Sequence, residues 1–125
     1  MTKPDDPWYA FAKKMIETPK LFSQKTLKKS QWANTDIATG DITDEISNLK
    51  SLDGKDIIVY GGASFDSSLI RAGLIDELRL FIYPVAIGNG LTIFKDLDEI
   101  QAFNLVKSVV FDCGIIGLHY EPKRV

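Results

Sequence analysis

The stretch DIIVYGGASFDSSLIRAGLIDELRLFIYPV, residues 56–85, decides the fold that this sequence predicts. Its first five residues are mostly β-branched or aromatic and predict a short strand that ends at the glycine pair Gly61-Gly62. Residues 65–72 predict a helix with Gly73 as its C-cap. Glu77–Val85 is an apolar run typical of a strand buried on both faces. Strand, helix and strand together predict a right-handed, parallel βαβ unit.

The segments on either side of this stretch extend the α/β pattern. Apolar residues repeat at helical spacing near the N-terminus, and short β-type runs alternate with turn signals elsewhere. We expect one domain over residues 1–125 that ends in an antiparallel β-hairpin. The expected flanking elements are a helix that starts at Asp5-Asp6-Pro7 and stops at Thr18-Pro19, strands over Lys20–Ser23 and Thr35–Thr39, a helix beginning near Asp41, and hairpin strands over Leu105–Phe111 and Ile115–Tyr120.

Composition excludes several classes of function. The chain has 15 basic and 17 acidic residues, a net charge of −2, and no Lys/Arg block, so no nucleic-acid partner is expected. No apolar run is long enough to span a membrane. A single cysteine, Cys113, excludes an intramolecular disulfide and favours a reducing compartment. One cysteine and one histidine provide few of the ligands that a zinc site needs, so we expect no metal. We also expect a cytoplasmic domain.

The glycine pair has two interpretations. A strand that ends in glycines and turns into a helix offers bare backbone N–H groups and the positive end of a helix dipole, which suit a phosphate. The donors would be the N–H groups of Ala63, Ser64 and Phe65. Alternatively, the glycines only permit an awkward turn or close packing of strand and helix. The local sequence leaves both interpretations open.

The other polar residues give weaker signals. Gln24-Lys25-Thr26 follows an expected strand and could hold a ribose or its 2′-phosphate, although the local sequence favours a solvated loop with an ordinary lysine. Asp76 and Glu77 are neighbours on a strand and point to opposite faces, so they cannot act as an acid/base pair. His119 has no evident carboxylate partner, and Gly88-Asn89-Gly90 lacks the Lys-Ser/Thr of a phosphate loop. We therefore assign no catalytic residue.

Residues 54–94 as a whole resemble a known family. A strand, Gly-Gly, a helix ending in Gly-Leu-Ile-Asp-Glu-Leu, a strand to Pro-Val, and then Gly-x-Gly with Ile-Phe follow one another. This order resembles the C-terminal reductase domain of bifunctional riboflavin-biosynthesis proteins and related dihydrofolate-reductase-like proteins. Upstream, Pro19–Leu27 followed by Trp32 resembles the family's strand and Ser-Arg-Thr-Leu segment.

The resemblance implies a three-layer α/β/α sandwich of the dihydrofolate reductase type, with a mixed, mostly parallel sheet and a C-terminal antiparallel hairpin. It implies an oxidoreductase that uses NADPH to reduce a small pteridine- or pyrimidine-like heterocycle. The cofactor-binding positions that it implies are Gln24, Lys25 and Thr26 near the ribose 2′-phosphate, and Tyr60, Gly61, Gly62, Ala63, Ser64 and Phe65 around the pyrophosphate.

Three departures qualify this expectation. Lys25 replaces the family's arginine and loses its bidentate fork, so NADH remains an alternative cofactor. Tyr60 replaces an acidic residue, which favours the dihydrofolate-reductase-like branch over riboflavin synthesis. The family's first strand, substrate loop and Gly-Arg-x-Thr segment have no counterpart, so we expect a shortened domain. The alternative function is a non-catalytic nucleotide-binding or oligomerisation domain, and we expect a homodimer with residues 78–85 or the hairpin near the contact.

Overall fold

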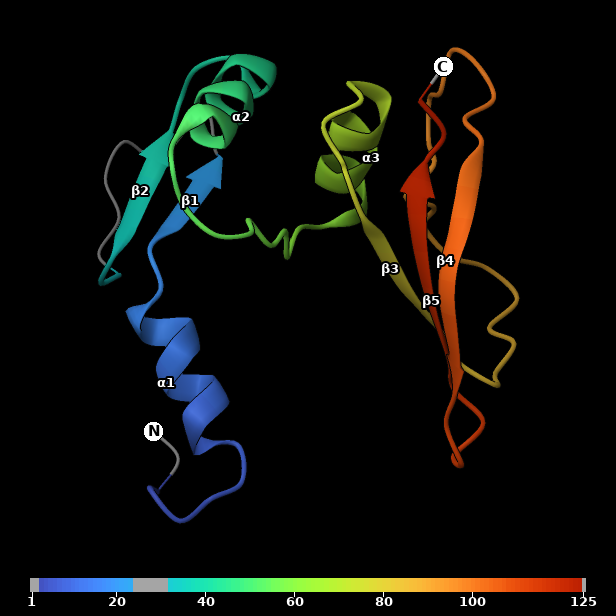
Figure 1. Cartoon of the computed structure of the whole chain (residues 1–125), viewed down its shortest axis with the longest axis horizontal. Helices are drawn as coiled ribbons and strands as arrows, with labels where there is room; N and C mark the ends of the chain where they lie inside the picture. Colours follow the sequence, from blue (N-terminus) through green and yellow to red (C-terminus); the bar gives the residue numbers. More distant parts are fainter. Residues whose placement is uncertain (1–2, 24–31, 125) are drawn as a thin grey trace. The chain divides into compact units, whose positions relative to one another are not determined.

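The computed structural model describes residues 3–23 and 32–124. The chain divides into two compact units, residues 1–52 and residues 53–125, which are described separately below (Figure 1). The described residues form three helices and five strands. Within residues 3–23 and 32–124, no helix is both long and apolar enough to cross a membrane.

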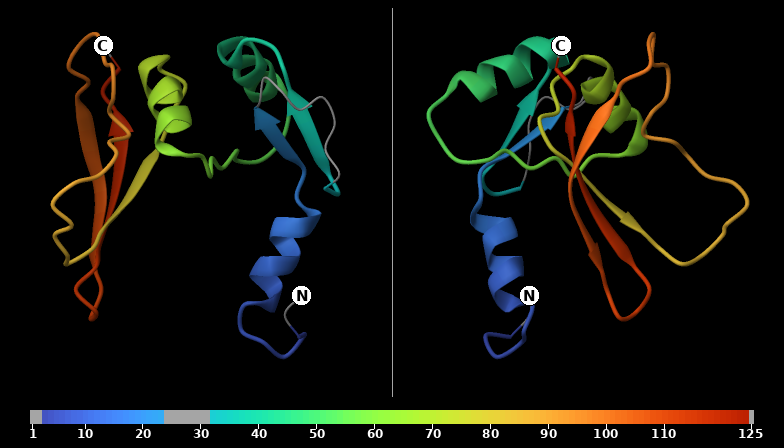
Figure 2. Two further views of the ribbon diagram at one scale, coloured as in Figure 1. Left: turned by 180° about the vertical axis from the view of Figure 1, so that it is seen from behind. Right: turned by 45° about the vertical axis from the view of Figure 1, so that its right-hand side comes forward.

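The first unit contains two helices and a pair of parallel strands (Figure 2). Its elements are α1 (Tyr9–Glu17), β1 (Lys20–Ser23), β2 (Thr35–Ala38) and α2 (Ile42–Ser51). β1 and β2 pair in parallel from Lys20↔Thr35 to Ser23↔Ala38. These four elements confirm the predicted ones, although α1 begins at Tyr9 and therefore later than the predicted start at Asp5-Asp6-Pro7.

Side chains mark the helix ends of the first unit. Asp41 caps α2, because its carboxylate accepts hydrogen bonds from the backbone N–H groups of Thr43 (2.9 Å) and Asp44 (3.3 Å). At the end of α1, the Lys20 ammonium donates to the carbonyl oxygens of Met15 and Ile16, each at 2.9 Å. These are carbonyls that the helix leaves without intrahelical donors, and a cation is favoured at that end of the dipole.

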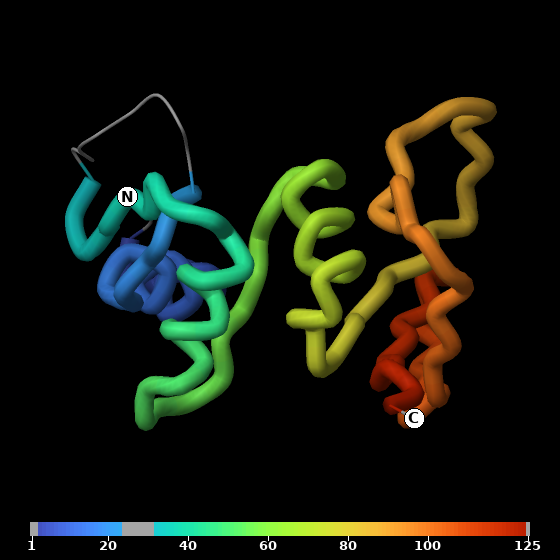
Figure 3. Tube along the Cα trace, turned by 90° about the horizontal axis from the view of Figure 1, so that it is seen from above, coloured from blue at the N-terminus to red at the C-terminus, as the bar shows by residue number. Residues whose placement is uncertain are grey.

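The second unit contains a helix and a three-stranded antiparallel sheet. Its elements are α3 (Ala63–Arg71), β3 (Leu78–Ile82), β4 (Phe103–Val110) and β5 (Ile116–Pro122). The strand order is β3-β5-β4, so β5 lies in the middle (Figure 1). β4 and β5 form the predicted terminal hairpin, which turns through Gly114 at φ +90. Residues 83–102 form the long connection from β3 to β4 (Figure 3).

The predicted parallel βαβ unit is wrong in one part. Residues 56–60 lead into α3 as predicted, but they form no strand with any described residue. Their apolar side chains are exposed, including Ile58 at 70% and Tyr60 at 71%. The partner of β3 is β5, and the pairing is antiparallel. Among the described strands the only parallel pair is β1 with β2, so the mostly parallel sheet is not observed.

β3 is shorter and less buried than the sequence predicts. The predicted run was Glu77–Val85, whereas the strand ends at Ile82. Pro84 has no N–H group to donate to a neighbouring strand, and the Val85 N–H bonds back to the carbonyl of Tyr83 at 2.8 Å. Phe81 remains 60% exposed, so burial on both faces is not observed.

α3 provides the core of the second unit. Leu69 and Ile70 are only 1% and 3% exposed. Gly73, at φ +68, follows the helix as predicted, and the Leu74 N–H reaches back to the carbonyl of Leu69 at 3.0 Å. Ser67 is also buried, and its hydroxyl donates to the carbonyl oxygen of Ile93 at 2.8 Å. This bond fixes the 83–102 connection to the helix.

Replacing Ser67 with alanine should destabilise the second unit by about 1–3 kcal/mol, because the Ile93 carbonyl loses its buried donor. Urea unfolding of the variant measures this change in free energy. Ser68→Ala is the matched control, since the Ser68 hydroxyl only bonds to Ser64 within the exposed turn of the same helix. Equal midpoints for the two variants would contradict this role of Ser67.

Candidate functional site

The N-terminus of α3 has free backbone donors, as the sequence predicts. Gly62 is the N-cap, and no side chain caps the helix. The N–H groups of Phe65 and Asp66 bond to the Gly62 carbonyl at 2.9 and 3.0 Å, whereas those of Ala63 and Ser64 have no acceptor among the described residues. Two of the three predicted donors are therefore available, and the Phe65 N–H is already engaged.

The two glycines have different surroundings. A Cβ atom on Gly61 would lie 2.6 Å from Cδ1 of Phe65 and 2.8 Å from Oδ1 of Asp66, so close packing requires glycine there. A Cβ atom on Gly62 would meet nothing within 4 Å, and its φ of −77° suits any residue. The packing interpretation thus explains Gly61, while Gly62 leaves open space beside the free amides of the helix.

Asp66 brings a negative charge into the first turn of α3. Partial burial raises the pKa of its carboxyl above the ordinary value. The carboxylate lies against Gly61 and therefore close to the place where a phosphate would bind. An anion at this helix end would benefit from the dipole and the free amides but would be repelled by Asp66.

The remaining predicted cofactor positions are not all described. Tyr60 is 71% exposed and belongs to the unpaired segment before Gly61. Gln24, Lys25 and Thr26 lie outside the described residues, so their predicted contact with a ribose phosphate stays a prediction.

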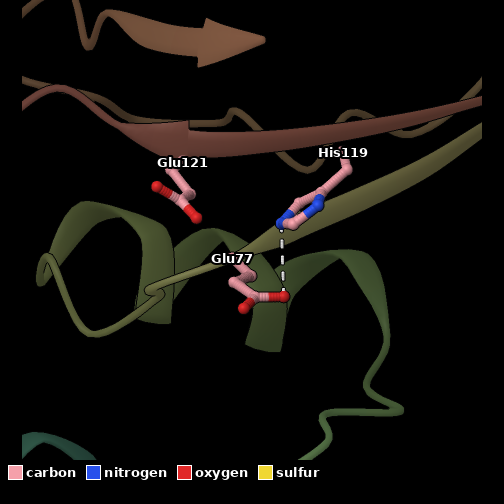
Figure 4. Close-up of side chains that lie close together, drawn as sticks. All are labelled: Glu77, His119 and Glu121. Atoms are coloured by element: carbon pink, nitrogen blue, oxygen red, sulfur yellow. Dashed lines mark ion pairs between the residues drawn. The ribbon is translucent and has the colours of Figure 1, made fainter. Parts of the chain in front are cut away.

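A second polar cluster lies on the sheet of the same unit (Figure 4). Nε2 of His119 lies 3.2 Å from Oε2 of Glu77, so the prediction that His119 lacks a carboxylate partner is wrong. Glu121 extends its carboxylate toward the same place, and the ligand atoms of all three residues lie within 4.8 Å of one another. Sequence reasoning missed this cluster because the antiparallel pairing of β3 with β5 creates it.

Arg79 contacts one side of this cluster. Its Nη2 and Nε donate to Oε2 of Glu77 at 2.8 and 3.3 Å. The hydrogen bond from Arg79 lowers the pKa of the Glu77 carboxyl below its ordinary value, so this group is ionised at neutral pH. Asp76 forms its ion pair with Arg124 instead. Glu77 is thus paired with Arg79 and Asp76 with Arg124, and both carboxylates precede β3 rather than lie on it.

An apolar cleft of about 420 Å³ lies at the C-terminal end of α3. It is lined by Ile70, Gly73, Ile100, Phe103 and the tail from Pro122 to Arg124. Because the glycine pair precedes the first residue of α3, the cleft and the predicted phosphate site lie at opposite ends of this helix.

Comparisons with known proteins agree with the family resemblance. The family model described as the RibD C-terminal domain matches residues 9–117, which include parts of both units. The uncharacterized protein YyaP of Bacillus subtilis strain 168 is 39% identical over 80 residues. This match covers 64% of the chain but only 43% of YyaP, so the chain spans less than half of that relative's length.

Two crystal structures share the fold. One is described as a "Putative riboflavin biosynthesis protein" from Shewanella sp. PV-4, with a TM-score of 0.71, 18% identity, and coverage of 98% of this chain and 84% of that one. The other is a pyrimidine reductase-like protein from Corynebacterium diphtheriae, with a TM-score of 0.62, 21% identity, and coverage of 86% and 51%. The predicted dihydrofolate-reductase-like α/β fold class is thereby confirmed.

Proposed function

The chain belongs to the RibD C-terminal domain family, and from this membership we propose that it is a reductase that uses NADPH to reduce a pteridine- or pyrimidine-like heterocycle. The observation that carries the proposal is the family match over residues 9–117, which includes the glycine pair and the start of α3. Bound NADPH would supply the hydride, and water or a proton donor beside the substrate would supply the proton.

The chain's own residues would bind and orient this cofactor. The N–H groups of Ala63 and Ser64 have no acceptor among the described residues, and Gly62 leaves space for close approach of a pyrophosphate. The free amides and the open space support a phosphate at this end of α3, and the charge of Asp66 in the first turn opposes it. Lys25 is proposed to contact the ribose 2′-phosphate, which would favour NADPH over NADH.

The test measures binding and turnover separately. NADPH and NADH are each titrated into the protein by calorimetry, and dihydrofolate or a pyrimidinone is then added while NADPH oxidation is followed. We expect saturable binding with preference for NADPH, and oxidation with at least one of the two substrates. Absence of NADPH binding would contradict the proposal.

Replacing Asp66 with asparagine should tighten NADPH binding about threefold to tenfold, because it removes a carboxylate beside the pyrophosphate, an effect of ~1 kcal/mol. The same titration measures the change. Asp112→Asn in the exposed hairpin turn is the control and should leave the affinity unchanged. If Asp66→Asn binds no more tightly than Asp112→Asn, the phosphate is not at this helix end.

A second candidate is a nucleotide-binding or oligomerisation domain without turnover. The exposed apolar segment 56–60 favours it, as does β3, which pairs on one side only among the described strands. We propose that a second copy of the chain covers these surfaces in a homodimer. Analytical ultracentrifugation should show a dimer, and a monodisperse monomer would contradict this. Saturable NADPH binding without oxidation of either substrate would favour this candidate over the reductase.

We also propose a cytoplasmic location. Cys113 is exposed and forms no disulfide in the described part of the chain. Free exposed thiols persist in reducing compartments, which supports this location.

A further inference from the structure

The cluster of Glu77, His119 and Glu121 is a product of strand pairing. His119 and Glu121 are two residues apart on β5 and therefore lie on one face of the sheet (Figure 4). Glu77 immediately precedes β3, whose pairing Leu78↔Tyr120 brings it beside Glu121. One nitrogen and two carboxylates thus converge from two strands, and they do so without any contribution from the proposed cofactor site.

The spacing of two of these groups is that of ligands around one cation. A Zn–N bond of about 2.0–2.1 Å and a Zn–O bond of about 2.0–2.2 Å, at an angle of about 90–110°, place the two ligand atoms about 2.8–3.5 Å apart. Nε2 of His119 and Oε2 of Glu77 are 3.2 Å apart. The third ligand atom, from Glu121, lies within 4.8 Å of the other two, and a rotation of this exposed side chain would bring it to ligand distance.

The imidazole nitrogen also lacks another partner. Nε2 of His119 is closed to solvent and makes no hydrogen bond with any residue that the structure describes, although the Glu77 oxygen is near enough for an ion pair. The contact between these two atoms at 3.2 Å is therefore electrostatic and not a hydrogen bond. Buried polar atoms without a partner are rare in proteins, and a bound cation would satisfy this one.

We propose that Glu77, His119 and Glu121 bind a divalent transition-metal ion, with Zn²⁺ as the ion that best matches one imidazole and two carboxylates. Water occupies the remaining position, as in other three-ligand zinc sites. The ion links the start of β3 to β5. Arg79 is its competitor, because its guanidinium occupies the same Glu77 oxygen. The Arg79 side chain is 70% exposed and can turn away into solvent.

The experiment uses the full chain carrying Cys113→Ser, which removes an exposed thiol that would bind zinc elsewhere. Zn²⁺ is titrated while the imidazole signals are followed by NMR, and they are unambiguous because the chain has only one histidine. We expect saturable shifts with one ion per chain. Unmoved imidazole signals up to about 1 mM Zn²⁺, a concentration that would detect even weak binding, would overturn the proposal.

Four variants assign the ligands. Glu77→Gln and Glu121→Gln should each weaken zinc binding at least tenfold. Arg79→Gln should instead tighten binding about threefold or more, because it removes a competing positive charge. The double variant Asp98→Asn, Glu99→Gln alters exposed carboxylates of the same unit and should change nothing. Circular dichroism confirms that each variant is folded. If Glu77→Gln and Glu121→Gln both bind zinc as tightly as the parent, the imidazole binds zinc alone and the proposed three-ligand site does not exist.

Discussion

Replacing Gly62 with valine is expected to weaken NADPH binding at least a hundredfold, about 2.7 kcal/mol, while the folded structure is kept. The backbone at Gly62 has φ −77° and ψ 163°, which valine adopts readily. A Cβ atom there meets no protein atom within 4 Å. The added side chain would therefore fill only the space that the proposed pyrophosphate occupies. Calorimetric titration measures the affinity, and circular dichroism measures the fold.

Gly54→Val is the matched control for this substitution. A Cβ atom on Gly54 would also meet nothing within 4 Å, and this glycine precedes the unpaired segment that leads into α3. The control variant should bind NADPH like the parent. If Gly62→Val is folded and binds NADPH with parental affinity, the pyrophosphate does not bind at this helix end. The family membership alone would then support the reductase proposal.

Replacing Leu69 with alanine should lower the free energy of unfolding of the second unit by about 2–5 kcal/mol. Leu69 is 1% exposed, and Ile70 is the only other buried large apolar residue among the described residues of this unit. Few other contacts can compensate for the cavity. Because typical domains are stable by only about 5–15 kcal/mol, this loss should leave a visible fraction of the unit unfolded.

The measurement should report the second unit alone. The single imidazole, His119, lies on β5, so its NMR signals can follow urea unfolding of the sheet. Leu91→Ala is the control, since Leu91 is 90% exposed and its removal should change stability by no more than about 0.5 kcal/mol. A change below about 1 kcal/mol for Leu69→Ala would show that α3 is not the core of this unit.

The helices and the hairpin could be predicted because their signals are local. Asp41 caps α2, Gly73 ends α3, and Gly114 turns the hairpin, and each feature depends on residues within one turn of the chain. The strand over residues 56–60 was wrong for the opposite reason. Its side chains have high β-propensity, but a strand also requires a partner, and propensity does not identify one.

Of the two candidate sites, one depends on local sequence and the other on strand pairing. The free amides of Ala63 and Ser64 follow from the glycine pair and the helix that it precedes, so the sequence predicts them. The cluster of Glu77 and His119 requires the register of β3 against β5, and β4 lies between these strands in the chain. A histidine two residues before a glutamate on a strand was a signal, but only the pairing shows that Glu77 joins them.

The strand order of the second unit also determines when its sheet can form. β5 lies between β3 and β4, yet it follows both in the chain, and β3 and β4 do not pair with each other. During synthesis the ribosome therefore releases both outer strands before the strand that joins them. Until β5 emerges, both outer strands expose their backbone groups to chaperones and to other nascent chains.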